Sequence, residues 1–164
     1  MSNDSAHTPT NSAAQSTRLR CARWAVRVSF LFVFLINVQC AISFIIWPDG
    51  FAPAYQLSGV SGQAAVAGIG VAFLMWNVTY PAVIVRPDSF YSLGVVVLIQ
   101  QLVGLVGECL IWANLPSVGY EILCASIARF VIFDGVGLLL MGATFIWFSW
   151  ERRRTKTRLS NTSQ

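Results

Sequence analysis

Residues 122–149, ILCASIARFVIFDGVGLLLMGATFIWFS, form an apolar run long enough to cross a lipid bilayer as one helix. A membrane-spanning helix needs about 20 such residues. Inside this run the stretch SIARFVIFDGVG, residues 126–137, contains two charged side chains, Arg129 and Asp134. The run therefore predicts a transmembrane helix, and its two charges raise the question of what surrounds them.

The composition of the whole chain is typical of a membrane protein. Of its 164 residues, 55% are hydrophobic and 11% are charged, and the mean hydropathy is +0.63. A soluble domain carries roughly 25% charged residues. Three further apolar runs reach spanning length, which places the predicted spans at about residues 24–47, 63–85, 90–112 and 122–149. We expect an all-α fold, an integral membrane four-helix bundle over residues 21–150.

The basic residues predict the orientation of this bundle. They are Arg18, Arg20, Arg23 and Arg27 before the first span, Arg86 between the second and third, Arg129 in the fourth, and Arg152, Arg153, Arg154, Lys156 and Arg158 after it. Ten of these eleven lie on one side of four spans, and the positive-inside rule makes that side cytoplasmic. Both termini should then be cytoplasmic, with residues 1–20 a disordered polar tail and residues 151–164 a basic tail.

The same charge pattern bears on location and partners. A multi-pass protein with this pattern belongs in the plasma membrane, which is the cell inner membrane in a bacterium. The net charge of +4 indicates contact with membrane lipids, including anionic lipids at the cytoplasmic face, and we expect no nucleic-acid partner. Five of the six tryptophans also lie at predicted span ends, where indole rings favour the headgroup layer: Trp24, Trp47, Trp112, Trp147 and Trp150.

The second and third spans each carry a patterned face. Ala64, Gly68 and Ala72 are four residues apart, a spacing that lets another helix approach closely. Further along the second span, Pro81 removes a backbone donor and predicts a kink at Asn77. In the third span, Gly94, Gln101 and Glu108 are seven residues apart, so a helix places them on one face, which we expect to point into the bundle.

Polar side chains from every span fall near mid-membrane and form the candidate site. The candidates for a ligand site or an intramembrane polar network are Asn37, Asn77, Tyr80, Gln101, Glu108, Arg129 and Asp134. Arg129 and Glu108 lie at similar depth, and an unpaired charge in a membrane costs several kcal/mol. We therefore expect an Arg129–Glu108 ion pair between the third and fourth spans. The remaining groups either fill a packed polar core or line a cavity, and both alternatives stay open.

Several kinds of chemistry are disfavoured by what the chain lacks. The only histidine, His7, lies in the N-terminal tail, so no bis-histidine haem site, histidine-based metal site or Ser/His/Asp triad is expected. We expect no metal and no cofactor, and the sequence assigns no catalytic residue. Cys109 and Cys124 are candidates for a disulfide or for buried free thiols.

Two functional hypotheses follow. The first is a small membrane protein with a polar intramembrane core that acts as a non-enzymatic binding, transport-accessory or assembly component. The alternative is a membrane-embedded enzyme acting on a lipid- or quinone-like substrate, with Glu108 or Asp134 as acid or base and Arg129 as electrostatic clamp. An accessible cavity that touches these side chains distinguishes the second from a packed core. A homo-oligomer or a subunit of a larger membrane complex is a further possibility.

Overall fold

A computed structural model of the protein describes residues 9–116 and 118–162, with side chains described over 14–116 and 118–157. This part of the chain consists of helices and connecting turns and contains no strand. The elements are α1 (Pro9–Ile46), α2 (Pro48–Phe51), the 3-10 helix η1 (Ala52–Tyr55), α3 (Gly59–Asn77), α4 (Tyr80–Val85), α5 (Tyr91–Asn114) and α6 (Glu121–Thr162).

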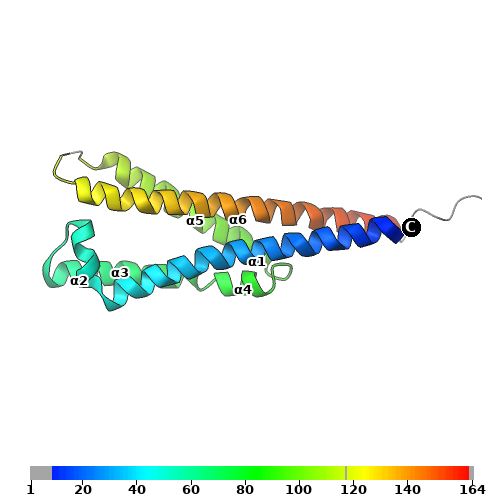
Figure 1. The fold of residues 1–164 in the computed structure, drawn as a ribbon, viewed down its shortest axis with the longest axis horizontal. Coiled ribbons are helices and arrows are strands. Elements are labelled where there is room, and N and C mark those ends of the chain that lie inside the picture. The colour runs from blue at the N-terminus through cyan, green and yellow to red at the C-terminus, as the bar shows by residue number, and fades with distance from the viewer. Residues whose placement is uncertain (1–8, 117, 163–164) are drawn as a thin grey trace, which may run out of the picture.

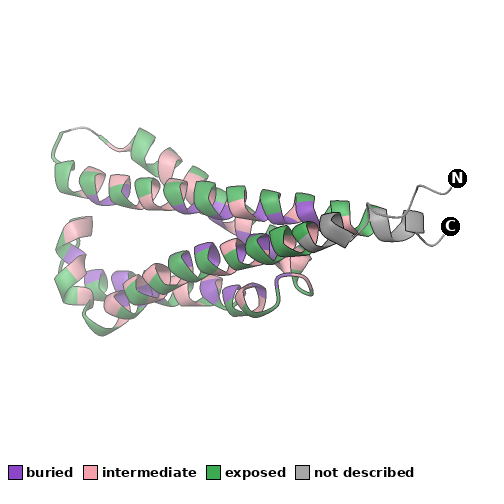
Figure 2. Cartoon of the chain, turned by 45° about the vertical axis from the view of Figure 1, so that its right-hand side comes forward, coloured by how far each residue is buried: buried purple, intermediate pink, exposed green. Residues whose placement is uncertain are grey.

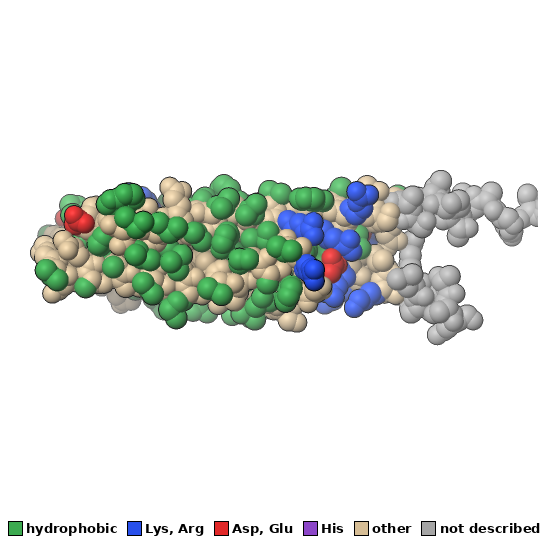
Figure 3. Space-filling view, turned by 90° about the horizontal axis from the view of Figure 1, so that it is seen from below, with side chains coloured by type: hydrophobic (Ala, Val, Ile, Leu, Met, Phe, Trp, Pro, Cys, Tyr) green, Lys and Arg blue, Asp and Glu red, His purple; other side chains and the backbone are tan. Residues whose placement is uncertain are grey.

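Four segments are long and apolar enough to cross a membrane. They are Ala14–Ile46, Gly59–Val85, Tyr91–Asn114 and Glu121–Thr157. The four-helix membrane bundle is therefore confirmed, and the protein is a multi-pass membrane protein. Apolar side chains cover most of the visible surface between its two ends, and Lys and Arg gather near one end (Figure 3). We call that end, where both α1 begins and α6 finishes, the basic end, and the opposite end the loop end.

The second span is broken where the sequence predicted a kink. The helix α3 finishes at Asn77, and α4 begins at Tyr80 with Pro81 in its first turn. Proline has no N–H to donate, and its ring presses on the carbonyl four residues earlier, that of Asn77. The Thr79 hydroxyl donates to the Trp76 carbonyl at 3.3 Å, which satisfies part of the interrupted backbone.

The tails differ from the expectation where they are described. Residues 9–20 were expected to be disordered, yet α1 begins at Pro9, and α6 continues through the basic tail to Thr162. Because α1 and α6 lie side by side toward the basic end (Figure 1), each supports the other there. Gln15 Nε2 donates to Thr155 Oγ1 at 3.4 Å, and Glu151 is buried. Residues 1–8 lie outside the described part.

The helices are arranged as two hairpins, one formed by α1 with α3 and α4, the other by α5 with α6. The helix α1 packs against α3, α4 and α6, and α6 packs against α5. Toward the loop end, the ribbon of α1 and α3 diverges from that of α5 and α6, and the two hairpins converge toward α4 (Figure 1). The larger apolar core lies in the converging part, where Phe30, Tyr80, Val97, Met141 and Phe148 are fully buried.

The face of α3 that approaches α1 is not the one that carries Ala64, Gly68 and Ala72. Ala64, Gly68 and Ala72 are exposed, whereas Gly62, Val66 and Gly70 are buried. A Cβ on Gly70 would lie 2.7 Å from the Ala41 carbonyl oxygen, so this glycine permits the close contact with α1. Small residues occur on both the buried and the exposed face of α3, and their spacing alone did not distinguish the two faces. Buried and exposed residues likewise alternate along the other long helices (Figure 2).

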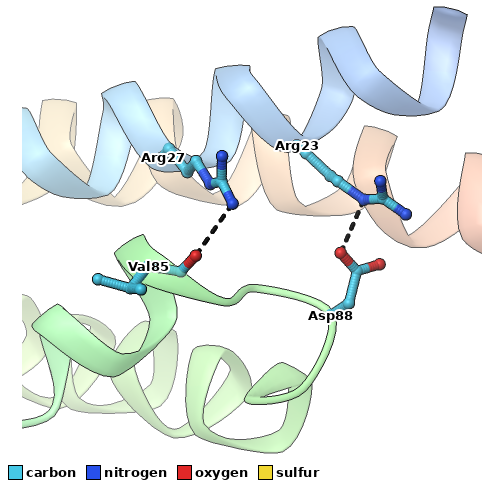
Figure 4. A network of polar contacts seen from close by, with 4 residues as sticks. All are labelled: Arg23, Arg27, Val85 and Asp88. Carbon is cyan, nitrogen blue, oxygen red and sulfur yellow. Dashed lines mark hydrogen bonds and ion pairs between the residues drawn. The ribbon is translucent and has the colours of Figure 1, made fainter.

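The turn between α4 and α5 is held to α1 by two arginines. Arg23 Nε lies 2.7 Å from Asp88 Oδ2, and Arg27 Nη2 donates to the Val85 carbonyl at 2.9 Å (Figure 4). The second contact satisfies the carbonyl at the end of α4, where a helix lacks its own donor. The hairpins are thus tied together near the basic end.

Candidate functional site

A cavity of about 420 Å³ lies between the two hairpins in the loop-end half of the bundle. Its walls come from α1, α2, η1, α3, α5 and α6. It exists because the hairpins diverge here, and because the smaller apolar cluster of this half, built on Phe44, Ala52 and Val66, joins α1 mainly to α3 and the α2–η1 loop. The sequence left open whether the polar residues fill a packed core or line a cavity, and the structure has a cavity.

One side of the cavity is aromatic. Phe44 lies at its centre, with ring-centroid distances of 4.9 Å to Phe51, 5.9 Å to Tyr55, 6.1 Å to Phe73 and 6.2 Å to Phe130. We call these five residues the aromatic wall; all of them line the cavity. No pattern in the sequence pointed to these five residues, apart from the two aromatic residues Phe51 and Tyr55 in the loop after the first span.

That loop covers part of the cavity. Pro48 cannot continue α1 and instead opens α2, and Gln56 adopts a left-handed conformation with φ 53° that reverses the chain after η1. Phe51, Ala54 and Tyr55 are thereby placed in the cavity lining. Burial raises the pKa of the Tyr55 hydroxyl, so it remains protonated at neutral pH.

Five of the seven predicted site residues line the cavity: Asn37, Asn77, Glu108, Arg129 and Asp134. Asn77 is 3% exposed, and its Nδ2 donates to the Phe73 carbonyl at 2.7 Å. Its Oδ1 has no hydrogen-bond partner among the described residues, and neither has Glu108 Oε2, although both atoms are buried. Most buried polar atoms in proteins are partnered, so these two oxygens are exceptions.

The expected ion pair between Arg129 and Glu108 is not formed. Arg129 Nη2 instead donates to Ser126 Oγ at 3.1 Å, on its own helix. Within the described side chains the ion pair of the structure is Arg23–Asp88, near the basic end. Arg129 remains exposed, and one of its five N–H donors is used by a hydroxyl one turn away rather than by Glu108 across the cavity.

The other two predicted residues, Tyr80 and Gln101, lie beneath the cavity and support it. The Tyr80 hydroxyl donates to Gln101 Oε1 at 3.1 Å, and Gln101 Nε2 donates to Asp134 Oδ1 at 2.9 Å. Tyr80 and Gln101 are buried. Asp134 Oδ2 lies 3.2 Å from the point that a Cβ on Gly104 would occupy. Three helices, α4, α5 and α6, are thus joined in one chain of hydrogen bonds that orients Asp134.

Trp76 separates the cavity from a shallow groove on the outside of α3 and α5. It lines both spaces, and the groove is otherwise formed by residues such as Met75, Ile99 and Val103, which face the membrane. A Cβ on Gly104 would lie 3.1 Å from the Trp76 ring, so the indole rests against α5 at a glycine. The Trp76 side chain is thus shared by the cavity and the groove.

The four cysteines form no disulfide, and the described cysteines and acidic residues form no metal site. Cys40, Cys109 and Cys124 are free thiols, as is Cys21 near the basic end, so the disulfide alternative for Cys109 and Cys124 is not realised. In the described residues no three His, Cys, Asp or Glu side chains are placed together to hold a metal ion.

Comparison of the chain with protein-family models, curated proteins and solved structures found no match.

Proposed function

We propose that the protein binds a small lipophilic molecule with a polar head in this cavity, and that it serves as a non-enzymatic binding or transport-accessory component. We place it in the plasma membrane with both termini cytoplasmic, because its Lys and Arg gather at the end shared by the termini. The cavity would then lie in the outer half of the bilayer.

The observation that carries this proposal is the cavity itself, in which unpartnered polar atoms face an aromatic wall. Ligand sites in proteins are concave and largely apolar, with a few polar groups that orient the ligand. Polar side chains that serve only to hold membrane helices together hydrogen-bond to each other across the helices. Asn77 Oδ1 and Glu108 Oε2 do not, although the Tyr80–Gln101–Asp134 chain just beneath them does.

The surroundings of the cavity support a lipophilic ligand in particular. The aromatic wall offers rings to an apolar body, and burying such a body is favourable. Trp76 lines both the cavity and the groove outside α3 and α5, so displacement of this one side chain would join them and admit a molecule dissolved in the membrane.

Filling the cavity tests the proposal, and α5 offers a matched control. Gly104→Leu adds a side chain where a Cβ already meets Trp76 and Asp134, whereas Gly107→Leu adds the same side chain where nothing lies within 4 Å. We expect native mass spectrometry to find a lipid-sized adduct on the wild type and on Gly107→Leu but not on Gly104→Leu. Three proteins free of adducts, or three with the same adduct, would contradict the proposal. The same spectra report the oligomeric state.

The enzyme hypothesis keeps one specific observation in its favour, because Glu108 and Asp134 both touch an accessible cavity. A general acid or base must reach the bound substrate. The retained molecule separates the two functions. If incubation of the loaded wild type changes the mass of this molecule, and Glu108→Gln binds it without changing it, the protein is an enzyme; an unchanged mass supports a binding protein.

A further inference from the structure

The buried, unpartnered polar atoms of the cavity are hydrogen-bond acceptors. Asn77 uses its NH₂ group for the Phe73 carbonyl and leaves Oδ1 without a partner, and Glu108 Oε2 has none among the described residues. Asp134 receives Gln101 at Oδ1, while its Oδ2 lies beside Gly104, a residue of the cavity lining. A ligand that satisfies these oxygens must therefore bring donors.

When Glu108 and Asp134 are both ionised, the acceptors also carry most of the charge in the cavity. Glu108 follows Gly104 by four residues on α5, so its Cα lies one helical turn, about 6 Å, along the helix from Gly104, the residue beside Asp134 Oδ2. One basic side chain, Arg129, lines the same cavity, and it is exposed and already donates to Ser126. Two carboxylates against one guanidinium leave one negative charge in excess when all three are ionised.

We infer that the head of the ligand is a protonated amine with N–H donors, held between Glu108 and Asp134 and within reach of Asn77, with its apolar body against the aromatic wall. This inference rests on the proposed function. An ammonium group matches both properties of the polar side, because it donates hydrogen bonds and cancels the excess charge. A cation is also attracted to the faces of aromatic rings, of which the cavity offers several.

The position of the Arg129 side chain is consistent with a cationic ligand, because its hydrogen bond to Ser126 holds it toward the loop end. Ser126 precedes it by one turn of α6, toward the loop end, and Asp134 follows it by five residues, about 7.5 Å deeper along the helix. The guanidinium is thus drawn away from the deeper carboxylate. An amine that approaches Asp134 meets the acidic side of the cavity and leaves Arg129 nearer the loops.

Two probes that differ in the head group test the inference. Dodecylamine is protonated at neutral pH, and dodecanol has the same chain with a neutral hydroxyl. Each is titrated separately onto the purified full chain in mild detergent, with bound mass followed by native mass spectrometry. We expect the amine to bind the wild type on the order of tenfold more tightly than the alcohol. Glu108→Gln should remove most of this preference, and Asp134→Asn should do the same.

Asp49→Asn is the matched control, because it removes one negative charge from the loop end at an exposed residue outside the cavity lining. It should keep the full preference for the amine. Equal binding of amine and alcohol to the wild type would overturn the inference and leave the proposed function intact. A preference that survives both cavity substitutions, or is lost equally in Asp49→Asn, would also overturn it. Binding of neither probe, with no adduct on the wild type, would refute both proposals together.

Discussion

Gln101 of α5 and Asp134 of α6 are joined by a hydrogen bond of 2.9 Å, directly beneath the cavity. The same amide accepts a hydrogen bond from Tyr80 of α4, so one buried side chain connects the broken second span to both helices of the other hairpin. These contacts form the floor of the cavity and orient a carboxylate toward it. The site therefore depends on a residue that does not itself line the cavity.

Replacing Gln101 should destabilise the protein more than replacing its neighbour. Gln101→Leu leaves the Tyr80 hydroxyl and Asp134 Oδ1 without their partner, which costs about 1–3 kcal/mol for buried polar groups. Gln100→Leu removes only the acceptor of a 3.4 Å hydrogen bond from Thr79. Thermal unfolding in detergent should show a clearly lower midpoint for Gln101→Leu only. Equal midpoints for the two variants would show that the buried chain contributes nothing.

The contact between α1 and α3 predicts opposite effects for two glycines of one helix. Gly70→Ala places a Cβ 2.7 Å from the Ala41 carbonyl oxygen and should lower stability by about 1–3 kcal/mol, since backbone must move. Gly68→Ala places a Cβ where nothing lies within 4 Å, and alanine is the better helix former. We expect an unchanged or slightly higher unfolding midpoint for Gly68→Ala. Similar losses in both would mean that α3 presents a different face to α1.

Because Arg129 and Glu108 are not paired, neither substitution should compensate for the other. A double-mutant cycle with Glu108→Gln and Arg129→Met should show no recovery of the unfolding free energy in the double variant, although both residues line one cavity and a smaller coupling through it is expected. Two partners of a direct ion pair would instead show recovery in the double variant, because each single change strands a buried charge. Such a recovery would show that the two side chains meet in the folded protein.

The proposed orientation can be measured with the free thiols. Cys21 is exposed near the basic end, and Ser58 is exposed in the loop before α3. In intact cells a membrane-impermeant maleimide should label a variant whose only cysteine is Ser58→Cys. A variant that keeps only Cys21 should be labelled only after the cells are permeabilised. The reverse pattern would place the cavity in the cytoplasmic half of the membrane.

The spans and the inward face of α5 could be predicted from local patterns in the sequence. Apolar run length is a local property, and the structure has four spanning segments where the runs occur. The spacing of Gly94, Gln101 and Glu108 was enough to predict the inward face of α5, because 3.6 residues per turn places them on one face of any helix. In the structure Gly94 lies against Phe145, Gln101 is buried, and Glu108 faces the cavity. The break at Pro81 followed from covalent geometry alone.

Which side chains meet depends on how the helices pack against one another. The positions of Arg129 and Glu108 along their helices placed them at similar depth and predicted an ion pair. In the structure the Arg129 side chain instead donates a hydrogen bond to Ser126. The choice between the two small-residue faces of α3 likewise depended on where α1 lies, as Gly70 shows. The cavity itself arises from the divergence of two hairpins and from Phe51 and Tyr55 in a loop that folds back over them. Such features depend on contacts between segments far apart in the chain, which no local pattern encodes.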